Sequence, residues 1–199
     1  MIKKIPLFPL KTIVLPEEIL PLHIFENRYK SMISKCLDSD DMFGIIYRND
    51  NQFSRIGCEV NIKKLLKEYE DGKYDILVKG QKRFEIINFF KEDDLWYGEI
   101  KKIDEKYDFM NKKIFSKILD KYLQILLYYN INHDIQEEMK KSKSFDFTKN
   151  VVIPITLKQE FLELKDELER MNFIEKILDS IINNSDEVQN LNFKEKTLN

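Results

Sequence analysis

The chain has 199 residues, enough for one domain or for two small domains packed together. Hydrophobic residues make up 43% and aromatic residues 12% of the chain, which excludes a disordered polymer and leaves material for a buried core. Charged residues reach 34% but the formal net charge is only -2, so the sequence lacks the excess of positive charge that is typical of nucleic-acid-binding proteins.

Cysteine content and the N-terminus indicate the compartment. Cys36 and Cys58 are too few for a disulfide framework, and their apolar neighbours predict buried free thiols. The first ten residues hold a short apolar run interrupted by prolines, without the features of a signal peptide. No apolar stretch approaches the ~20 residues needed to cross a bilayer. We therefore expect a soluble, cytoplasmic protein with no membrane contact.

The first hundred residues have the β-branched and aromatic runs typical of strands, with one helix among them. The helix is expected over residues 24–37, where apolar side chains recur at helical spacing from Phe25 to Cys36. Asp71-Gly72 predicts a β-hairpin with a type I′ turn. Extended segments are expected over residues 2–8, 12–15, 18–22, 42–47, 58–70, 73–90 and 95–103.

The apolar period becomes helical after residue 106. Residues 114–126 carry a wide apolar stripe, as a core-facing helix does. Pro154 precedes a second helical stretch, in which apolar residues recur at steps of four and three from Leu157 to Met171. Thr156 and Gln159 match a capping box at its start.

The change of period divides the chain into three parts. We expect a β-rich subdomain over residues 1–104, a helical subdomain over residues 105–184 and a polar tail over residues 185–199.

Four ordered blocks resemble the N-terminal, substrate-binding domain of the Lon protease family. Residues 8–16 and 20–29 follow its opening pattern "F-P-L … V-L-P … L-P-L-H-I-F-E-x-R-Y". Residues 43–46 and 56–60 resemble two of its strands, and residues 71–84 resemble "D-G-x-Y-x-I-x-V-x-G-x-x-R-F". The chain departs from the pattern at Asn27, where proline is common.

This resemblance implies an α+β fold: a PUA-like β pseudo-barrel with one helix, followed by a C-terminal helical bundle. It also implies a stand-alone domain without the AAA+ ATPase and the peptidase of Lon. The implied function is non-catalytic polypeptide binding, as an adaptor or a chaperone-like factor. The implied partners are unfolded or exposed apolar polypeptide segments, and a separate protease or ATPase.

The residues themselves give no catalytic constellation. None of the five glycines belongs to a G-x-x-x-x-G-K-[ST] phosphate loop. Ser116-Lys117 and Ser142-Lys143 are adjacent in sequence, so their side chains do not face each other on a helix. His23 and His133 are the only histidines and lie far apart, unlike metal ligands. We expect no enzymatic activity, no cofactor and no metal.

Charged residues in the best motifs are read as structural. His23 is expected to be a satisfied core or cap residue, and Glu26 to stabilise the helix start. Lys79, Lys82 and Arg83 are expected on a solvated strand edge. The motif residues with this structural reading are His23, Phe25, Glu26, Arg28 and Tyr29.

Polypeptide binding needs exposed apolar surface, and aromatic pairs near turns are the candidates. The candidate binding residues are Phe89, Phe90, Trp96, Tyr97, Tyr128 and Tyr129, each of which also fits a core position. Two alternatives stay open, because PUA-like barrels also bind RNA, and a barrel mouth near His23, Glu26 and Arg28 also suits a small molecule.

Overall fold

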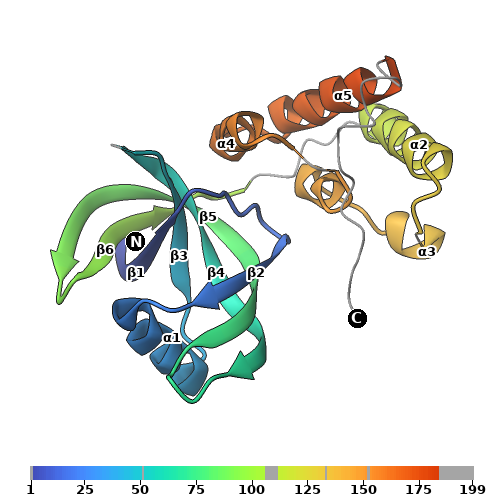
Figure 1. Ribbon diagram of the computed structural model, residues 1–199. Helices are drawn as coiled ribbons and strands as arrows, with labels where there is room; N and C mark the ends of the chain where they lie inside the picture. The colour runs from blue at the N-terminus through green and yellow to red at the C-terminus, as the bar shows by residue number, and fades with distance from the viewer. Residues whose placement is uncertain (1, 51, 106–111, 133, 152, 184–199) are drawn as a thin grey trace. The chain divides into compact units, whose positions relative to one another are not determined.

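The computed structural model describes residues 2–50, 52–105, 112–132, 134–151 and 153–183 (Figure 1). The predicted polar tail and His133 lie outside these residues. The chain divides into two compact units, Met1–Asp104 and Glu105–Asn199. The strands are β1 (Ile2–Leu10), β2 (Ile19–Ile24), β3 (Phe43–Arg48), β4 (Phe53–Glu68), β5 (Tyr74–Glu92) and β6 (Leu95–Lys102). The helices are α1 (Asn27–Ser39), α2 (Lys112–Tyr128), α3 (Ile135–Glu138), η1 (Ser144–Thr148), α4 (Ile155–Glu163) and α5 (Glu167–Asn183).

The strands of the first unit curve into a barrel (Figure 1). Their order is β2-β5-β4-β3-β1-β6, and an additional pairing of β5 with β6 closes five of them into a ring. β1 and β3 are parallel, whereas the remaining pairs are antiparallel. β2 is added at the edge of β5. The strands together with the helices confirm the expected α+β class with a β pseudo-barrel.

Two apolar clusters hold the first unit together. Strand residues alternate between the two faces, so one set of side chains fills the barrel interior. That set is Ile5, Leu7, Ile46, Phe84, Ile86 and Ile100. The second cluster lies under α1, which contributes Tyr29, Met32, Ile33 and Cys36 at helical spacing.

The helix begins three residues later than predicted, and this changes the environment of Phe25. Phe25 precedes α1 and is 59% exposed, so its predicted place in the apolar stripe is wrong. Both cysteines are buried, as predicted. Burial raises the pKa of the Cys36 thiol to about 11, which makes the thiol unreactive at neutral pH.

The hairpin between β4 and β5 is confirmed, but its predicted turn type is wrong. The Gly72 N–H donates to the Tyr69 carbonyl at 2.8 Å, and the Tyr69 N–H donates to the Lys73 carbonyl at 2.9 Å. Of Asp71 and Gly72, only Gly72 has a positive φ, at 75°. A type I′ turn needs positive φ at both central residues, so the chain forms a three-residue loop ending in a left-handed glycine.

A two-residue turn of the predicted kind occurs between β5 and β6 instead. Asp93 and Asp94 both have positive φ, 45° and 66°, and Glu92 pairs with Leu95 across the turn. Aspartate tolerates this backbone region better than most residues. The turn sets the register of the aromatic residues in both strands.

The loop between β1 and β2 closes tightly over Gly80. The Glu17 N–H donates to the Gly80 carbonyl, and the Gly80 N–H donates to the Glu18 carbonyl, both at 2.9 Å. A Cβ at Gly80 would lie 2.1 Å from the carbonyl oxygen of Leu15, so only glycine permits this approach. The strand predicted over residues 12–15 does not form, and the Leu15 N–H donates to the Glu18 carboxylate at 3.0 Å.

Arg83, predicted on a solvated strand edge, is a buried charged residue of β5. Lys82 is exposed, but Arg83 has no exposed surface, so its prediction is wrong. Glu18 and Glu59 are also buried. The pKa of the buried Cys58 thiol is raised mainly by its burial; the charges of Glu18 and Glu59 raise it further, and that of Arg83 lowers it. The buried Glu59 carboxylate forms ion pairs with Lys3 at 3.3 Å and with Lys102 at 3.0 Å, which offset its burial.

The second unit is helical. α2 and α5 pack together, and the Lys121 ammonium bridges Glu175 and Asp179 of α5 at 2.8 and 2.5 Å. η1 is buried throughout and packs against α5. Phe147 of η1 contacts Tyr122 of α2, with ring centroids 5.4 Å apart. Residues 144–148, for which the sequence pattern predicts no element, thus supply part of the core.

The continuous stripe predicted from Leu157 to Met171 is interrupted. α4 ends at Glu163 and α5 begins at Glu167. Asp166 starts α5, because its carboxylate accepts the Leu168 N–H at 2.8 Å. The predicted capping box is wrong, since Pro154 is the N-cap of α4 and no side chain caps it.

The Arg170 side chain joins the segment between α4 and α5 to the core of the helical unit. Its fully buried guanidinium donates to the Leu164 carbonyl at 2.8 Å and to the Glu167 carboxylate at 3.0 Å. It also donates to Glu105 at 2.7 Å and to the Ser144 hydroxyl at 3.2 Å. One side chain therefore joins the end of α4, the start of α5 and η1.

We expect Gly80→Ala to lower the free energy of unfolding by about 2 kcal/mol or more, because the new Cβ would overlap the Leu15 carbonyl. Urea denaturation followed by tryptophan fluorescence measures the change through Trp96 in the same unit. Gly72→Ala is the control, since a Cβ at Gly72 would meet only the Lys30 side chain, at 3.9 Å, and only its φ of 75° is unfavourable. It should cost about 1 kcal/mol. Equal stabilities of Gly80→Ala and wild type would contradict the close approach.

We expect Arg170→Met to destabilise the helical unit by about 3 kcal/mol, because the buried Glu167 carboxylate loses its cation. The loss is measured by urea denaturation followed by far-ultraviolet circular dichroism. Lys140→Met removes an exposed ion pair with Glu137 and should change stability by about 0.5 kcal/mol or less. Similar effects of the two substitutions would count against the proposed role of Arg170.

Candidate functional site

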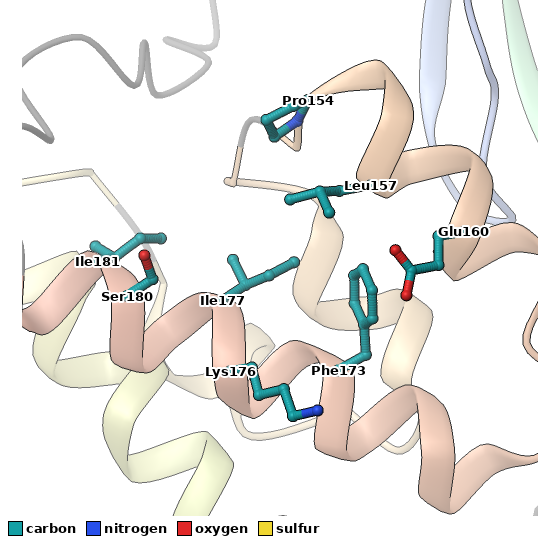
Figure 2. Close-up of a pocket in the computed structure, with 8 residues that line it drawn as sticks. All are labelled: Pro154, Leu157, Glu160, Phe173, Lys176, Ile177, Ser180 and Ile181. Carbon is teal, nitrogen blue, oxygen red and sulfur yellow. The ribbon is translucent and has the colours of Figure 1, made fainter.

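An apolar groove lies between α4 and α5 of the helical unit (Figure 2). Its volume of about 460 Å³ falls in the range of ~300–1,000 Å³ for binding pockets. Figure 2 shows Leu157 of α4 and Ile177 of α5 pointing toward each other across it. The apolar lining residues are Pro154, Leu157, Phe173, Ile177 and Ile181, and the polar ones are Glu160, Lys176 and Ser180.

An aromatic stack supports one end of the groove. The Phe173 ring lies 5.5 Å from the ring of Phe161, which in turn lies 5.2 Å from the ring of Phe145. Phe161 and Phe145 are fully buried, whereas Phe173 is half-buried. The groove wall is therefore anchored to the core, while its surface stays open to a ligand.

The groove has one carboxylate and one ammonium among its lining side chains. Glu160 comes from α4 and Lys176 from α5, and both are exposed. Figure 2 shows the Glu160 carboxylate beside the Phe173 ring, with Lys176 toward the same end of the groove. The apolar surface can bury uncharged side chains, and the two charges can select what flanks them.

The four aromatic candidates of the barrel are only half-buried and lie on the β5–β6 hairpin. Phe89 and Trp96 pack with Phe53, at ring distances of 5.5 and 5.1 Å. Phe90 stacks on Tyr97, with centroids 5.9 Å apart. They thus form two small clusters, each with part of its surface accessible, and their role in binding remains a prediction.

The two tyrosine candidates of the helical unit differ from one another. Tyr128, the last residue of α2, is 73% exposed, whereas the next residue, Tyr129, is half-buried. Their rings meet edge to face at 4.9 Å. Tyr128 is therefore available to a partner, and its participation also remains a prediction.

The residues of the opening motif are occupied with one another or with the fold. His23 is 51% exposed, so a core position is wrong, but its Nδ1 lies 2.7 Å from the Asp75 carboxylate. Arg28 and Glu26 form an ion pair at 2.5 Å, and Arg28 lies over the ring of buried Tyr29. The Arg28 guanidinium also donates to the Asp94 carbonyl at 3.4 Å, which joins the start of α1 to the β5–β6 turn, and the structural role of the motif residues remains a prediction.

The carboxylate of Asp75 holds this corner together. It accepts hydrogen bonds from the Tyr69 hydroxyl at 2.6 Å and interacts with His23. These two interactions, that of Tyr69 first, lower the pKa of Asp75, and the hydrogen bond to Asp75 raises the pKa of Tyr69. The His23 ring also stacks on exposed Phe25, with centroids 6.0 Å apart. The cluster links β2 to the tip of the β4–β5 hairpin.

The groove itself was not evident in the sequence. The apolar stripe predicts core positions for Leu157, Phe173 and Ile177, and helical spacing does not separate core from groove. One signal was present: α4 is short, yet it carries apolar residues on more than one face. Phe161 and Leu162 are buried, while Leu157 is 38% exposed.

A family model described as the ATP-dependent protease La (LON) substrate-binding domain matches residues 4–180. The chain belongs to this family. The match confirms the resemblance found in the motifs and extends it into α5. The matched range includes every residue that lines the groove except Ile181.

Curated relatives of this LON domain include two bacterial proteins called Lon protease. That of Syntrophus aciditrophicus is 23% identical over 193 residues, covering 91% of this chain and 22% of the relative. That of Cytophaga hutchinsonii is 21% identical over 196 residues, covering 89% of this chain and 24% of the relative. The chain thus spans about a quarter of their length or less.

Solved structures of LON N-terminal domains share the fold. The Lon N-terminal domain protein from Xanthomonas campestris aligns with a TM-score of 0.68 at 20% identity, over 89% of this chain and 98% of that one. The N-terminal domain of the Mycobacterium avium complex Lon protease gives 0.72 at 15% identity, with the same coverages of 89% and 98%. At these identities the likeness supports the fold alone.

Two features of the described part of the LON domain concern membrane spans and metal sites. None of its helices is long and apolar enough to span a bilayer. Within the same residues, no three His, Cys, Asp or Glu side chains gather as a metal site would require.

Proposed function

We propose that this protein is a non-catalytic polypeptide-binding module that holds exposed apolar segments in the α4–α5 groove. It would act as an adaptor or chaperone-like factor, alone or with a separate protease or ATPase. The groove is the observation that carries the proposal, because it offers open apolar surface within a LON substrate-binding domain.

Burial of apolar surface provides the binding energy. Each Å² of apolar area removed from water contributes roughly 25 cal/mol, without requiring a particular sequence. A groove lined by Leu157, Ile177 and Phe173 therefore suits varied apolar segments that a folded protein would keep inside. This lack of sequence requirement fits a protein that recognises unfolded chains.

Strand addition to the barrel is a less suitable mode. Pro21 lies in the middle of β2 and has no N–H to offer, which blunts that edge. Beyond the segment of β4 that pairs with β3, the strand carries Lys63, Lys64 and Lys67, and lysines discourage pairing with another chain. Side-chain burial in the helical unit is therefore the better-supported mode.

The proposal predicts that Leu157→Glu weakens binding of an unfolded polypeptide at least tenfold, or by about 1.4 kcal/mol. The charge would occupy the apolar groove, while the 38% exposure of Leu157 lets the variant fold. Fluorescence anisotropy of a labelled, reduced and carboxymethylated protein, titrated with the full chain, gives the dissociation constants.

Leu168→Glu is the matched control. Leu168 is on α5 and is 47% exposed, but it does not line the groove, so its affinity should stay within about twofold. Circular dichroism melting verifies that both variants fold. No binding by the wild-type protein would refute polypeptide binding, and equal losses in both variants would refute the groove as its site.

A further inference from the structure

The construction of the groove restricts the conformation of what it binds. Both walls are helices, in which the N–H groups after the first turn and the C=O groups before the last turn are bonded within the helix. The polar lining groups are the side chains of Glu160, Lys176 and Ser180. An extended polypeptide in the groove would therefore bury backbone donors and acceptors with few partners, which is unfavourable.

We infer, building on the proposed function, that the groove selects segments that form an amphipathic α-helix. A helix satisfies its own backbone hydrogen bonds and presents only apolar side chains to the groove. An unfolded substrate would adopt this helix as it binds. The recognised feature is then the spacing of apolar residues rather than their identity.

The length of the groove sets the size of the bound helix. Phe173, Ile177 and Ile181 follow one another at steps of four along α5. At ~1.5 Å per residue they span roughly 12 Å, which equals about two turns of a partner helix. Such a segment brings three apolar side chains to the groove, at positions i, i+4 and i+7.

The charges of the groove specify what flanks the apolar face. A basic residue beside it would meet Glu160, and an acidic residue would meet Lys176. Figure 2 shows both groups toward the Phe173 end, so the complementary pair belongs at one end of the partner helix. The occupant is therefore an amphipathic helix with mixed charges on its polar side, and not a uniformly apolar segment.

Two labelled peptides of about 14 residues and identical composition test this inference. One places leucines at i, i+4 and i+7 with lysine and glutamate between them, and the other alternates leucine with polar residues. We expect the helix-patterned peptide to bind the full chain at least tenfold more tightly and to gain helical circular dichroism in the complex. Leu157→Glu should weaken it at least tenfold, whereas Leu168→Glu should leave its affinity within twofold.

The unfolded-protein titration run in parallel separates the two proposals. If the unfolded protein binds and the two peptides bind equally, helix selection is wrong and polypeptide binding stands. If neither peptide nor the unfolded protein binds, both are wrong. Light scattering supplies the last check, because a dimer that Leu157→Glu dissociates would show that a second copy occupies the groove and would overturn the inference.

Discussion

The buried guanidinium of Arg170 is the interaction on which the candidate site depends. It donates to the Leu164 carbonyl just after α4 and to the Glu167 carboxylate at the start of α5. Without this junction the apolar pattern would favour one continuous helix, and two helices could not face each other across a groove. A buried cation that bonds a carbonyl and carboxylates is well satisfied, so it fixes one local geometry.

The groove combines an anchored wall with an open surface. Phe161 is fully buried and holds Phe173, which exposes part of its ring to the groove. This arrangement keeps apolar surface exposed without collapse, because the supporting rings are packed in the core. If the groove binds a ligand as proposed, its walls would not have to be ordered on binding, so more of the burial energy would appear as affinity.

The barrel unit is stabilised by different means. Gly80 allows the β1–β2 loop to close on β5, and Arg83, Glu18 and Glu59 are buried in the same unit. The edge formed by β2 carries Pro21, and the end of β4 beyond its pairing with β3 carries a group of lysines; both protect against strand addition by other chains. These features stabilise the barrel and discourage pairing of another chain with these edges.

The sequence by itself determined the family, the α+β class and most elements, because strand and helix periods and the motif residues are local properties. Only the tertiary structure decided that Arg83 is buried, that Phe25 is exposed and that Leu157 lines a groove. The turn type at Gly72 and the break between α4 and α5 before Glu167 were also not predicted from the local sequence pattern. Burial or exposure of these side chains depends on which other parts of the chain pack against them, as Arg170 shows, since its guanidinium bonds Glu105 and Ser144 as well as its own helix. A periodic pattern specifies which side of a helix is apolar, but packing against the rest of the chain decides whether that side is core or binding surface.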